Sequence, residues 1–248
     1  MDESLFPQDF LALLKRSNRI MVSTGAGIST ESGVPAFRGA GGLWNEFKPE
    51  ELATPEGFAR DPKKVWKWYD WRRQIISQVQ PNAGHYALAA LEQMVPHFFL
   101  FTQNIDGLHQ QAGSKRVYEL HGNLWNVRCT REERAFALLE NPLKQLPPLC
   151  DCGALLRPDV VWFGESLPAE ILQLAWQVAR SCDLFFVIGT SATVEPAASL
   201  AWIAKDSGAM IIEINPDMTP ITDIADESFS EKSGVLLPRL IEALKSHE

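Results

Sequence analysis

The sequence predicts an α/β protein with a doubly wound parallel sheet and a smaller inserted module. Five short apolar runs have the composition of buried parallel strands; they lie at residues 20–23, 98–101, 117–120, 184–188 and 210–214. Helix-like stretches separate most of these runs, which is typical of such sheets. A glycine-rich segment directly follows the first run, as in Rossmann-like folds.

Two helices have clear signals in the sequence. Residues 81–85 (PNAGH) open one helix, which continues through Ala89 and Leu91. A second helix is expected at residues 236–245, with a proline near its start.

Two stretches interrupt the alternation of strands and helices. Residues from about 38 to 80 are rich in tryptophan, and residues from about 123 to 158 carry three cysteines and several prolines. We expect both to form the smaller module within a single catalytic domain spanning residues 1–248. The large Rossmann-like part then comprises residues of about 1–37, 81–122 and 159–248. In such folds ligands bind in a crevice at the carboxyl ends of the strands.

Composition excludes several classes of partner. The 248 residues are 46% hydrophobic and 22% charged, which fits a globular protein with a sizeable core. A formal net charge of -8 argues against a nucleic-acid surface and makes basic, lysine-rich proteins better electrostatic partners. No apolar run approaches the roughly 20 residues of a membrane span. The first five residues lack the features of a secretory signal, so we expect a cytoplasmic location and no membrane partner.

The glycine-rich segment begins with Gly25-Ala26-Gly27. A strand that leads into such a turn brings backbone N–H groups close to a pyrophosphate, so the segment predicts a dinucleotide site. The usual GxGxxG fingerprint is incomplete, because Thr30 holds the last glycine position, and this disfavours a dehydrogenase. Glycine is also the default residue of any tight turn, which leaves a purely structural interpretation open.

His121 directly follows the predicted strand at 117–120. Histidine suits proton transfer near neutral pH because its ordinary pKa is about 6.5. The alternative is a packed histidine bonded to a backbone carbonyl. We assign the remaining histidines to that structural class: His85, His97, His109 and His247.

Five ordered motifs resemble those of the sirtuins, the NAD-dependent protein deacylases. They are GAGIS with GVPAFR at 25–29 and 33–38, TQNIDGLH at 102–109, ELHG at 119–122, LRPDVVWFGE at 156–165 and GTS at 189–191. The resemblance extends over nearly the whole chain. It implies an enzyme in which the acyl oxygen attacks the nicotinamide ribose, nicotinamide leaves, and the acyl group ends on ADP-ribose.

The resemblance also assigns residues to this reaction. It makes His121 the catalytic base and gives Asn104 and Asp106 the nicotinamide ribose and carboxamide. From the residues alone, Asn104 and Asp106 equally fit an ordinary turn that caps a helix from Gly107. The full NAD-binding set that the resemblance implies is Gly25, Ala26, Gly27, Ile28, Ser29, Phe37, Arg38, Gln103, Asn104, Asp106, Gly189, Thr190, Ser191, Asn215 and Ser233.

The expected substrates are acylated lysine side chains of proteins. Residues 160–163 form a β-rich run that offers an edge to an extended peptide, or is a plain edge strand. The resemblance places Val161, Trp162 and Phe163 on the peptide-binding side.

Tyr69 and Arg72 are three residues apart and share one face of a predicted helix. A tyrosine hydroxyl and a guanidinium can together bind a carboxylate; the alternative is a surface arginine beside a core aromatic residue. The pair resembles the Tyr-x-x-Arg signature of class III sirtuins, which implies removal of succinyl and malonyl groups. Open alternatives are an acetyl-lysine-preferring sirtuin, an ADP-ribosyltransferase, an NAD-dependent oxidoreductase and a non-catalytic NAD or acyl-peptide sensor.

Four residues form a candidate metal site: Cys129, Glu132, Cys150 and Cys152. Sirtuins usually carry two Cys-x-x-Cys pairs around a structural zinc, and this chain departs from that pattern. Tetrahedral zinc accepts a carboxylate oxygen, so three thiolates with Glu132 are a possible set. A metal-free loop is the equal alternative. Cys182 precedes an apolar strand and is expected to be a small buried residue.

Overall fold

The computed structural model describes residues 5–39 and 41–246. His247 and the first four residues, to which two of the expectations refer, lie outside this part. Within it, six parallel strands form one sheet in the order β3-β2-β1-β7-β8-β9. The strands are β1 (Arg19–Thr24), β2 (His97–Thr102), β3 (Val117–Glu119), β7 (Leu184–Ile188), β8 (Met210–Ile214) and β9 (Glu227–Phe229). The direction of winding therefore reverses between β1 and β7, and the predicted doubly wound, Rossmann-like sheet is confirmed.

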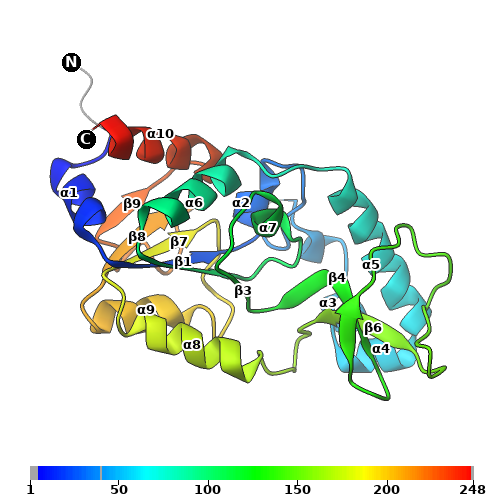
Figure 1. Ribbon diagram of the computed structural model, residues 1–248. Coiled ribbons are helices and arrows are strands. Elements are labelled where there is room, and N and C mark those ends of the chain that lie inside the picture. Colours follow the sequence, from blue (N-terminus) through cyan, green and yellow to red (C-terminus); the bar gives the residue numbers. More distant parts are fainter. Residues whose placement is uncertain (1–4, 40, 247–248) are drawn as a thin grey trace.

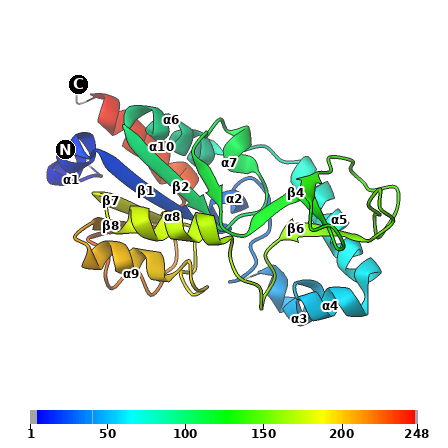
Figure 2. The same ribbon diagram turned by 60° about the horizontal axis from the view of Figure 1, so that its bottom comes forward.

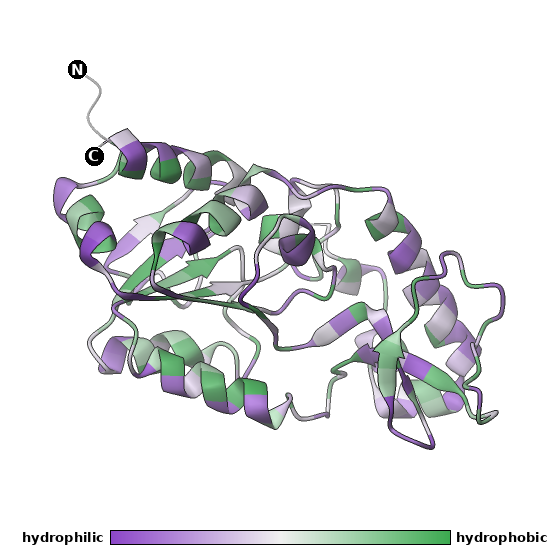
Figure 3. Ribbon diagram, in the orientation of Figure 1, coloured by the Kyte–Doolittle hydropathy of each residue, from purple (hydrophilic) through white to green (hydrophobic). Residues whose placement is uncertain are grey.

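Helices cover both faces of this sheet (Figures 1 and 2). On one face lie α1 (Gln8–Arg16), α6 (Ala83–Met94) and α10 (Ser233–Ser246), and on the other α8 (Ala169–Ala179) and α9 (Ser199–Asp206). Side chains alternate between the faces along a strand, so Ile20 and Val22 join the core under α6 and α10, whereas Met21 joins the core under α8 and α9. Figure 3 shows the matching alternation of hydrophobic and hydrophilic residues along α8 and α10.

The five predicted strands are present, and the structure adds β9, which the sequence did not reveal. β9 has three residues, none of them fully buried, so it has no apolar run to mark it. α6 begins where predicted, because the Asn82 side chain accepts from Gly84 N–H and His85 completes a capping box. α10 begins at Ser233 rather than at residue 236, and Pro238 lies inside it.

The smaller module lies beside the sheet at its carboxyl edge (Figure 1). Its strands form an antiparallel sheet of order β5-β4-β6 within the described residues: β4 (Gly122–Cys129), β5 (Ala135–Ala137) and β6 (Leu156–Val160). Its helices are α3 (Pro49–Leu52), α4 (Pro55–Arg60) and α5 (Pro62–Ser77). Gly122, Asp159 and Val160, which the sequence assigned to the large part, thus belong to strands of the smaller sheet.

α5 has strong start signals, which is why this helix forms where the tryptophans cluster. Asp61 caps it by accepting from Lys64 N–H, and Pro62 occupies the first helical position. Trp66 and Val65 are buried against β4 and β6. The remaining short elements are α2 (Gly27–Thr30), η1 (Leu43–Asn45) and α7 (Leu108–Gln111). No helix in the described part of the chain is both long enough and apolar enough to cross a membrane.

Candidate active site

A cavity of about 780 Å³ lies where the carboxyl ends of β1, β2 and β7 meet the smaller module. We call the part formed by these strand ends the sheet end, and the part lined by Trp68, Tyr69 and Trp162, together with the buried Arg72 beside Trp68, the module end. The predicted site residues that line the cavity are Gly25, Ala26, Gly27, Phe37, Arg38, Tyr69, Gln103, Asn104, His121, Val161, Trp162, Phe163, Gly189, Thr190, Ser191, Asn215 and Ser233. Ile28, Ser29, Asp106 and Arg72 are buried directly behind this lining.

The glycines of the first turn serve close packing. Gly27 N–H donates to Gly189 O at 2.8 Å, and Gly25 N–H donates to Ile188 O at 3.0 Å. A Cβ on Gly27 would lie 2.6 Å from Gly189 O, so only glycine lets the turns after β1 and β7 interlock. These two N–H groups are therefore bonded within the protein and are not available to a pyrophosphate. What the glycines provide is the shape of the sheet end.

Ser29, Asn104 and Asp106 form a buried hydrogen-bonded group at the sheet end. The Ser29 hydroxyl donates to Asp106 Oδ2 at 2.8 Å, and Asn104 Nδ2 donates to Gly25 O at 3.0 Å and to Ser29 Oγ at 3.2 Å. Asp106 Oδ1 also accepts from Leu108 N–H at 2.9 Å, so the turn expected from the residues alone is present as well. Burial raises the pKa of Asp106, while its hydrogen bonds and the Arg72 charge oppose this.

His121 follows β3 and lines the cavity. Its Nδ1 lies 3.0 Å from Gln103 O, and because a carbonyl oxygen only accepts, Nδ1 carries the proton there. Nε2 is then the nitrogen with a free electron pair. Burial lowers the pKa of His121, and the bond to Gln103 only partly offsets this, so the ring is neutral near pH 7. The ring is thus in the state that accepts a proton.

Two of the histidines assigned to structure are buried beneath the sheet end. His109 Nε2 lies 2.9 Å from Thr24 Oγ1, and His85 Nε2 lies 3.4 Å from Ser29 Oγ. Burial lowers the pKa of His85 to about 4. His97, by contrast, is exposed at the start of β2, so it is not the packed residue that was expected.

The module end buries an arginine without a carboxylate partner. Arg72 is 2% exposed; its Nη1 donates to Pro35 O at 3.3 Å, and Nε has no acceptor among the described residues. The guanidinium lies 5.0 Å from the centre of the Phe37 ring. Burial lowers the pKa of Arg72 to about 10, although the charge of Asp106 opposes the change. Trp68 Nε1 is likewise buried without an acceptor in the described part of the chain.

The segment expected to bind peptide differs from the predicted edge. β6 ends at Val160, and the N–H groups that follow are already bonded. Val161 N–H donates to His121 O at 2.9 Å, Phe163 N–H to Ala53 O at 2.9 Å, and Trp162 N–H to the Glu165 carboxylate at 2.9 Å. The expectation that residues 160–163 form one edge strand is therefore wrong for residues 161–163. Their N–H groups bond to other segments that surround the cavity.

Comparison with known protein families shows which family this chain belongs to. The sequence pattern of the Sir2 family matches residues 25–196. The chain belongs to the Sir2 family. Among relatives, an NAD-dependent protein deacylase of Aquifex aeolicus is 56% identical over 227 residues, covering 91% of this chain and 95% of the relative.

Solved structures of the family have the same fold. A Sir2 homologue mutant in complex with ADP-ribose superimposes with a TM-score of 0.95 at 47% identity, and 98% of each chain is covered. A Sir2 homologue in complex with NAD gives a TM-score of 0.92 at 48% identity, covering 98% of this chain and 96% of that one.

The candidate metal ligands converge in this Sir2-family chain. The ligand atoms of Cys129, Glu132, Cys150 and Cys152 all lie within 4.8 Å of one another. The Sγ atoms of Cys129 and Cys152 are 3.5 Å apart, near the roughly 3.8 Å expected between two thiolates on one tetrahedral zinc. The donor set therefore fits a zinc ion in size and chemistry. Cys182 is buried elsewhere, as expected, and burial raises its thiol pKa to about 12.

Two groups at the module end were not predicted from the sequence. Trp68 lines the cavity and lies four residues before Arg72, a spacing that placed it on the same helical face. Arg157 and Glu165 form an ion pair beside Trp162. Both belong to the matched 156–165 motif, but a pairing across eight residues of irregular chain has no periodic signal.

Proposed function

We propose that this protein removes succinyl and malonyl groups from lysine side chains of proteins, with NAD as co-substrate. NAD-dependent protein deacylation itself follows from membership of the Sir2 family and from the relatives that carry this activity in their names. The finer proposal concerns the acyl group. The observation that carries it is the guanidinium of Arg72, which is buried at the module end without a carboxylate partner in the described part of the chain.

A buried cation is costly unless an anion pairs with it. Tyr69 lines the cavity one helical turn before Arg72, and its hydroxyl adds a hydrogen-bond donor. Trp68 Nε1 is a further donor without an acceptor among the described residues. A succinyl or malonyl chain carries a terminal carboxylate into this place, whereas an acetyl group brings no charge. The excess of donors supports an acidic acyl chain.

The sheet end supplies the reacting groups in this proposal. His121 accepts a proton at Nε2 from a ribose hydroxyl of the co-substrate, while Gln103 O holds the Nδ1 proton and fixes the ring. Asn104 and Asp106 hold the nicotinamide side, and Ser29 keeps the Asp106 carboxylate in place. The turns of residues 25–27 and 189–191, with Asn215 and Ser233, contact the rest of the NAD molecule.

A matched set of acetyl, malonyl and succinyl peptides tests the acyl preference. With saturating NAD, kcat/KM is expected to be highest for the succinyl or malonyl peptide, and mass spectrometry should detect nicotinamide and the corresponding O-acyl-ADP-ribose. A higher kcat/KM for the acetyl peptide would favour the acetyl-lysine alternative. ADP-ribose attached to the peptide would favour a transferase.

We also propose that Cys129, Glu132, Cys150 and Cys152 hold one structural zinc ion. The ion would join the end of β4 and the loop after it to the loop that precedes β6, and so stabilise the smaller module. Elemental analysis of protein grown with sufficient zinc should find one zinc per chain, and Cys182→Ser should leave that content unchanged. Protein that folds normally without zinc would favour the metal-free loop.

A further inference from the structure

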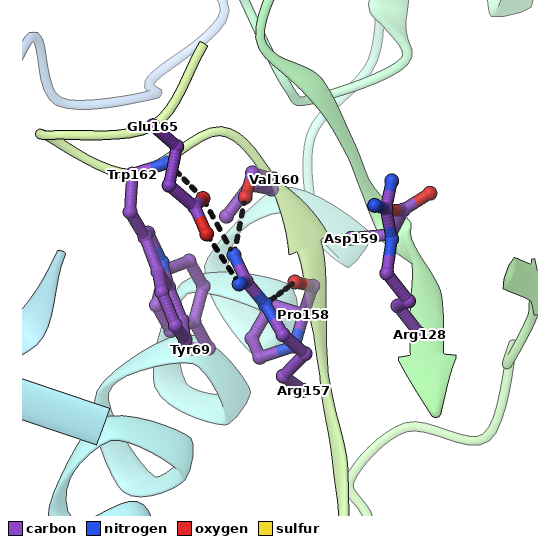
Figure 4. A network of polar contacts seen from close by, with 8 residues as sticks. All are labelled: Tyr69, Arg128, Arg157, Pro158, Asp159, Val160, Trp162 and Glu165. Carbon is purple, nitrogen blue, oxygen red and sulfur yellow. Dashed lines mark hydrogen bonds and ion pairs between the residues drawn. The ribbon is translucent and has the colours of Figure 1, made fainter. Parts of the chain in front are cut away.

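A chain of polar contacts leads from β6 to the Tyr69 hydroxyl (Figure 4). Arg157 forms two bonds with Glu165, of 2.5 Å from Nη1 and 2.8 Å from Nη2. Glu165 in turn accepts from Trp162 N–H, and Trp162 Nε1–H donates to the Tyr69 hydroxyl at 2.9 Å. The path therefore joins an ion pair at the rim of the cavity to a residue of the module end.

Trp162 packs between the side chains of Arg157 and Phe58. The Arg157 guanidinium lies 3.6 Å from the centre of the indole ring, and the Phe58 ring packs at 5.3 Å. The residue is 3% exposed. Burial would raise the pKa of Glu165, but the bonds from Arg157 and from Trp162 N–H outweigh it and lower that pKa. The carboxylate thus stays charged and keeps the guanidinium over the ring.

In the hydrogen bond between Trp162 and Tyr69, the chemistry of the indole decides which residue is the donor. An indole N–H only donates, so the Tyr69 oxygen is the acceptor in this contact. The Tyr69 hydroxyl still carries its own hydrogen, and no hydrogen bond donated by it is found among residues 5–39 and 41–246. A phenylalanine in place of Trp162 would keep an aromatic ring, smaller than the indole, but would lack the N–H donor and leave the Tyr69 hydroxyl free to rotate.

We propose that Arg157, Glu165 and Trp162 are positioning residues for acyl specificity: they occupy an acceptor site of the Tyr69 oxygen and so direct its hydrogen to the terminal carboxylate of the acyl chain. This inference rests on the proposed function. It adds that Tyr69 selects acidic acyl chains only while Trp162 holds it. The residues act through Tyr69 and do not touch the reacting atoms.

The test compares succinyl with acetyl peptides, because a purely structural defect lowers both rates together. Trp162→Phe retains an aromatic ring but removes the indole N–H that donates to Tyr69. We expect the ratio of succinyl to acetyl kcat/KM to fall about tenfold. Glu165→Gln retains an acceptor for Trp162 N–H but weakens the hold on Arg157, and we expect a smaller fall in the same ratio. Thermal unfolding of both variants reports whether the fold is intact.

Asp159→Asn is the matched control. Asp159 of β6 pairs with Arg128 of β4 at 2.7 Å, and Figure 4 shows this pair apart from the Trp162 group. Its loss should leave the succinyl-to-acetyl ratio unchanged. A fall in the ratio as large as that of Glu165→Gln would overturn the inference, since any ion pair of the module would then have the same effect.

A double-mutant cycle with Tyr69→Phe separates the two proposals. If Trp162 acts through Tyr69, adding Trp162→Phe to Tyr69→Phe should not lower the ratio further. An equal fall in both backgrounds, or an unchanged ratio in Trp162→Phe when Tyr69→Phe reduces it, would overturn the inference and leave the proposed function standing. A wild-type enzyme without preference for acidic acyl groups would overturn the proposed function, and the inference with it.

Discussion

At the sheet end of the cavity the buried polar side chains satisfy one another, whereas at the module end two buried donors have no acceptor in the described part of the chain. Ser29, Asn104 and Asp106 satisfy each other and the Gly25 carbonyl within a buried group. At the module end, Arg72 Nε and Trp68 Nε1 are buried with no acceptor in the described part of the chain. The sheet end is therefore assembled without a ligand, whereas in the proposed function an acceptor on the ligand completes the module end. Preorganised polar groups suit catalysis, and unmatched donors suit discrimination between ligands.

The largest expected effect comes from removing the proposed base, His121, at the sheet end. His121→Ala should lower kcat by about 10²–10⁴-fold or more, because general-base catalysis by a positioned side chain contributes on that order. Binding of NAD, followed by calorimetry, should change little, since the surrounding hydrogen-bonded groups do not depend on the imidazole. Turnover within a few-fold of wild type would remove His121 as the base.

The next effect should appear at the module end. Losing one member of a buried charged pair typically costs about 2–5 kcal/mol, so Arg72→Met should lower succinyl-peptide kcat/KM by roughly tenfold to several thousandfold. Acetyl-peptide turnover should fall much less, or rise, because an unmatched guanidinium has gone.

The neighbouring Arg73 offers the control for Arg72. Arg73 is also buried and its Nε also lacks an acceptor among the described residues, but its Nη atoms donate to the carbonyls of Leu124, Leu138 and Glu140. Arg73→Met should therefore lower stability and affect all acyl peptides alike. If Arg72→Met behaves in the same way, Arg72 is structural and the two ends do not differ as proposed.

The smallest expected effect concerns stability at the sheet end. The folded-state pKa of His85 is about 4, below the value of about 6.5 in an unfolded chain. Between these values the unfolded state binds more protons, so this stabilisation is complete above about pH 6.5 and is lost as the pH falls to about 4. The contribution is on the order of 3 kcal/mol. Urea unfolding over this range should show the loss.

His85→Gln separates the contribution of His85 to the pH dependence of stability from that of the carboxylates, which titrate in both proteins. Glutamine at this position keeps the capping box of α6 but does not titrate. The variant should lose less stability between pH 6.5 and 4 than wild type. Identical pH dependence in the two proteins would mean that His85 is not held neutral in the fold.

Strong local patterns made the sheet and the sheet end predictable. β7 is buried along its whole length and reads as a continuous apolar run, whereas β9 has no apolar run and could not be found. His121 and Asn104 were predicted to lie at the site because their motifs directly follow predicted strands, and both line the cavity. The convergence of Cys129 with Cys150 was expected from the resemblance to the paired cysteines of sirtuins, with a metal-free loop as the equal alternative.

Long-range pairings were out of reach of the sequence. Trp162 and Tyr69 are bonded across two different elements, and nothing in the local pattern of either residue indicates the other. The backbone of residues 161–163 reads as strand by composition, but its N–H groups bond to His121 O, to Glu165 and to Ala53 O instead of to a ladder. In both cases tertiary contacts override local propensity.

The place of β1 in the sheet has a consequence for how this chain folds. Ile20 pairs with Phe98 on one side and with Leu184 on the other, about twice as far along the chain. Each doubling of a closed loop costs only about 0.6 kcal/mol of entropy, so inserting a whole module between paired strands is cheap at equilibrium. The folding rate is affected instead, because pairings between distant segments slow the search for the native topology. During that search the apolar edges of β1 and β7 stay exposed, and a nascent chain of this design depends on rapid covering of those edges to avoid aggregation.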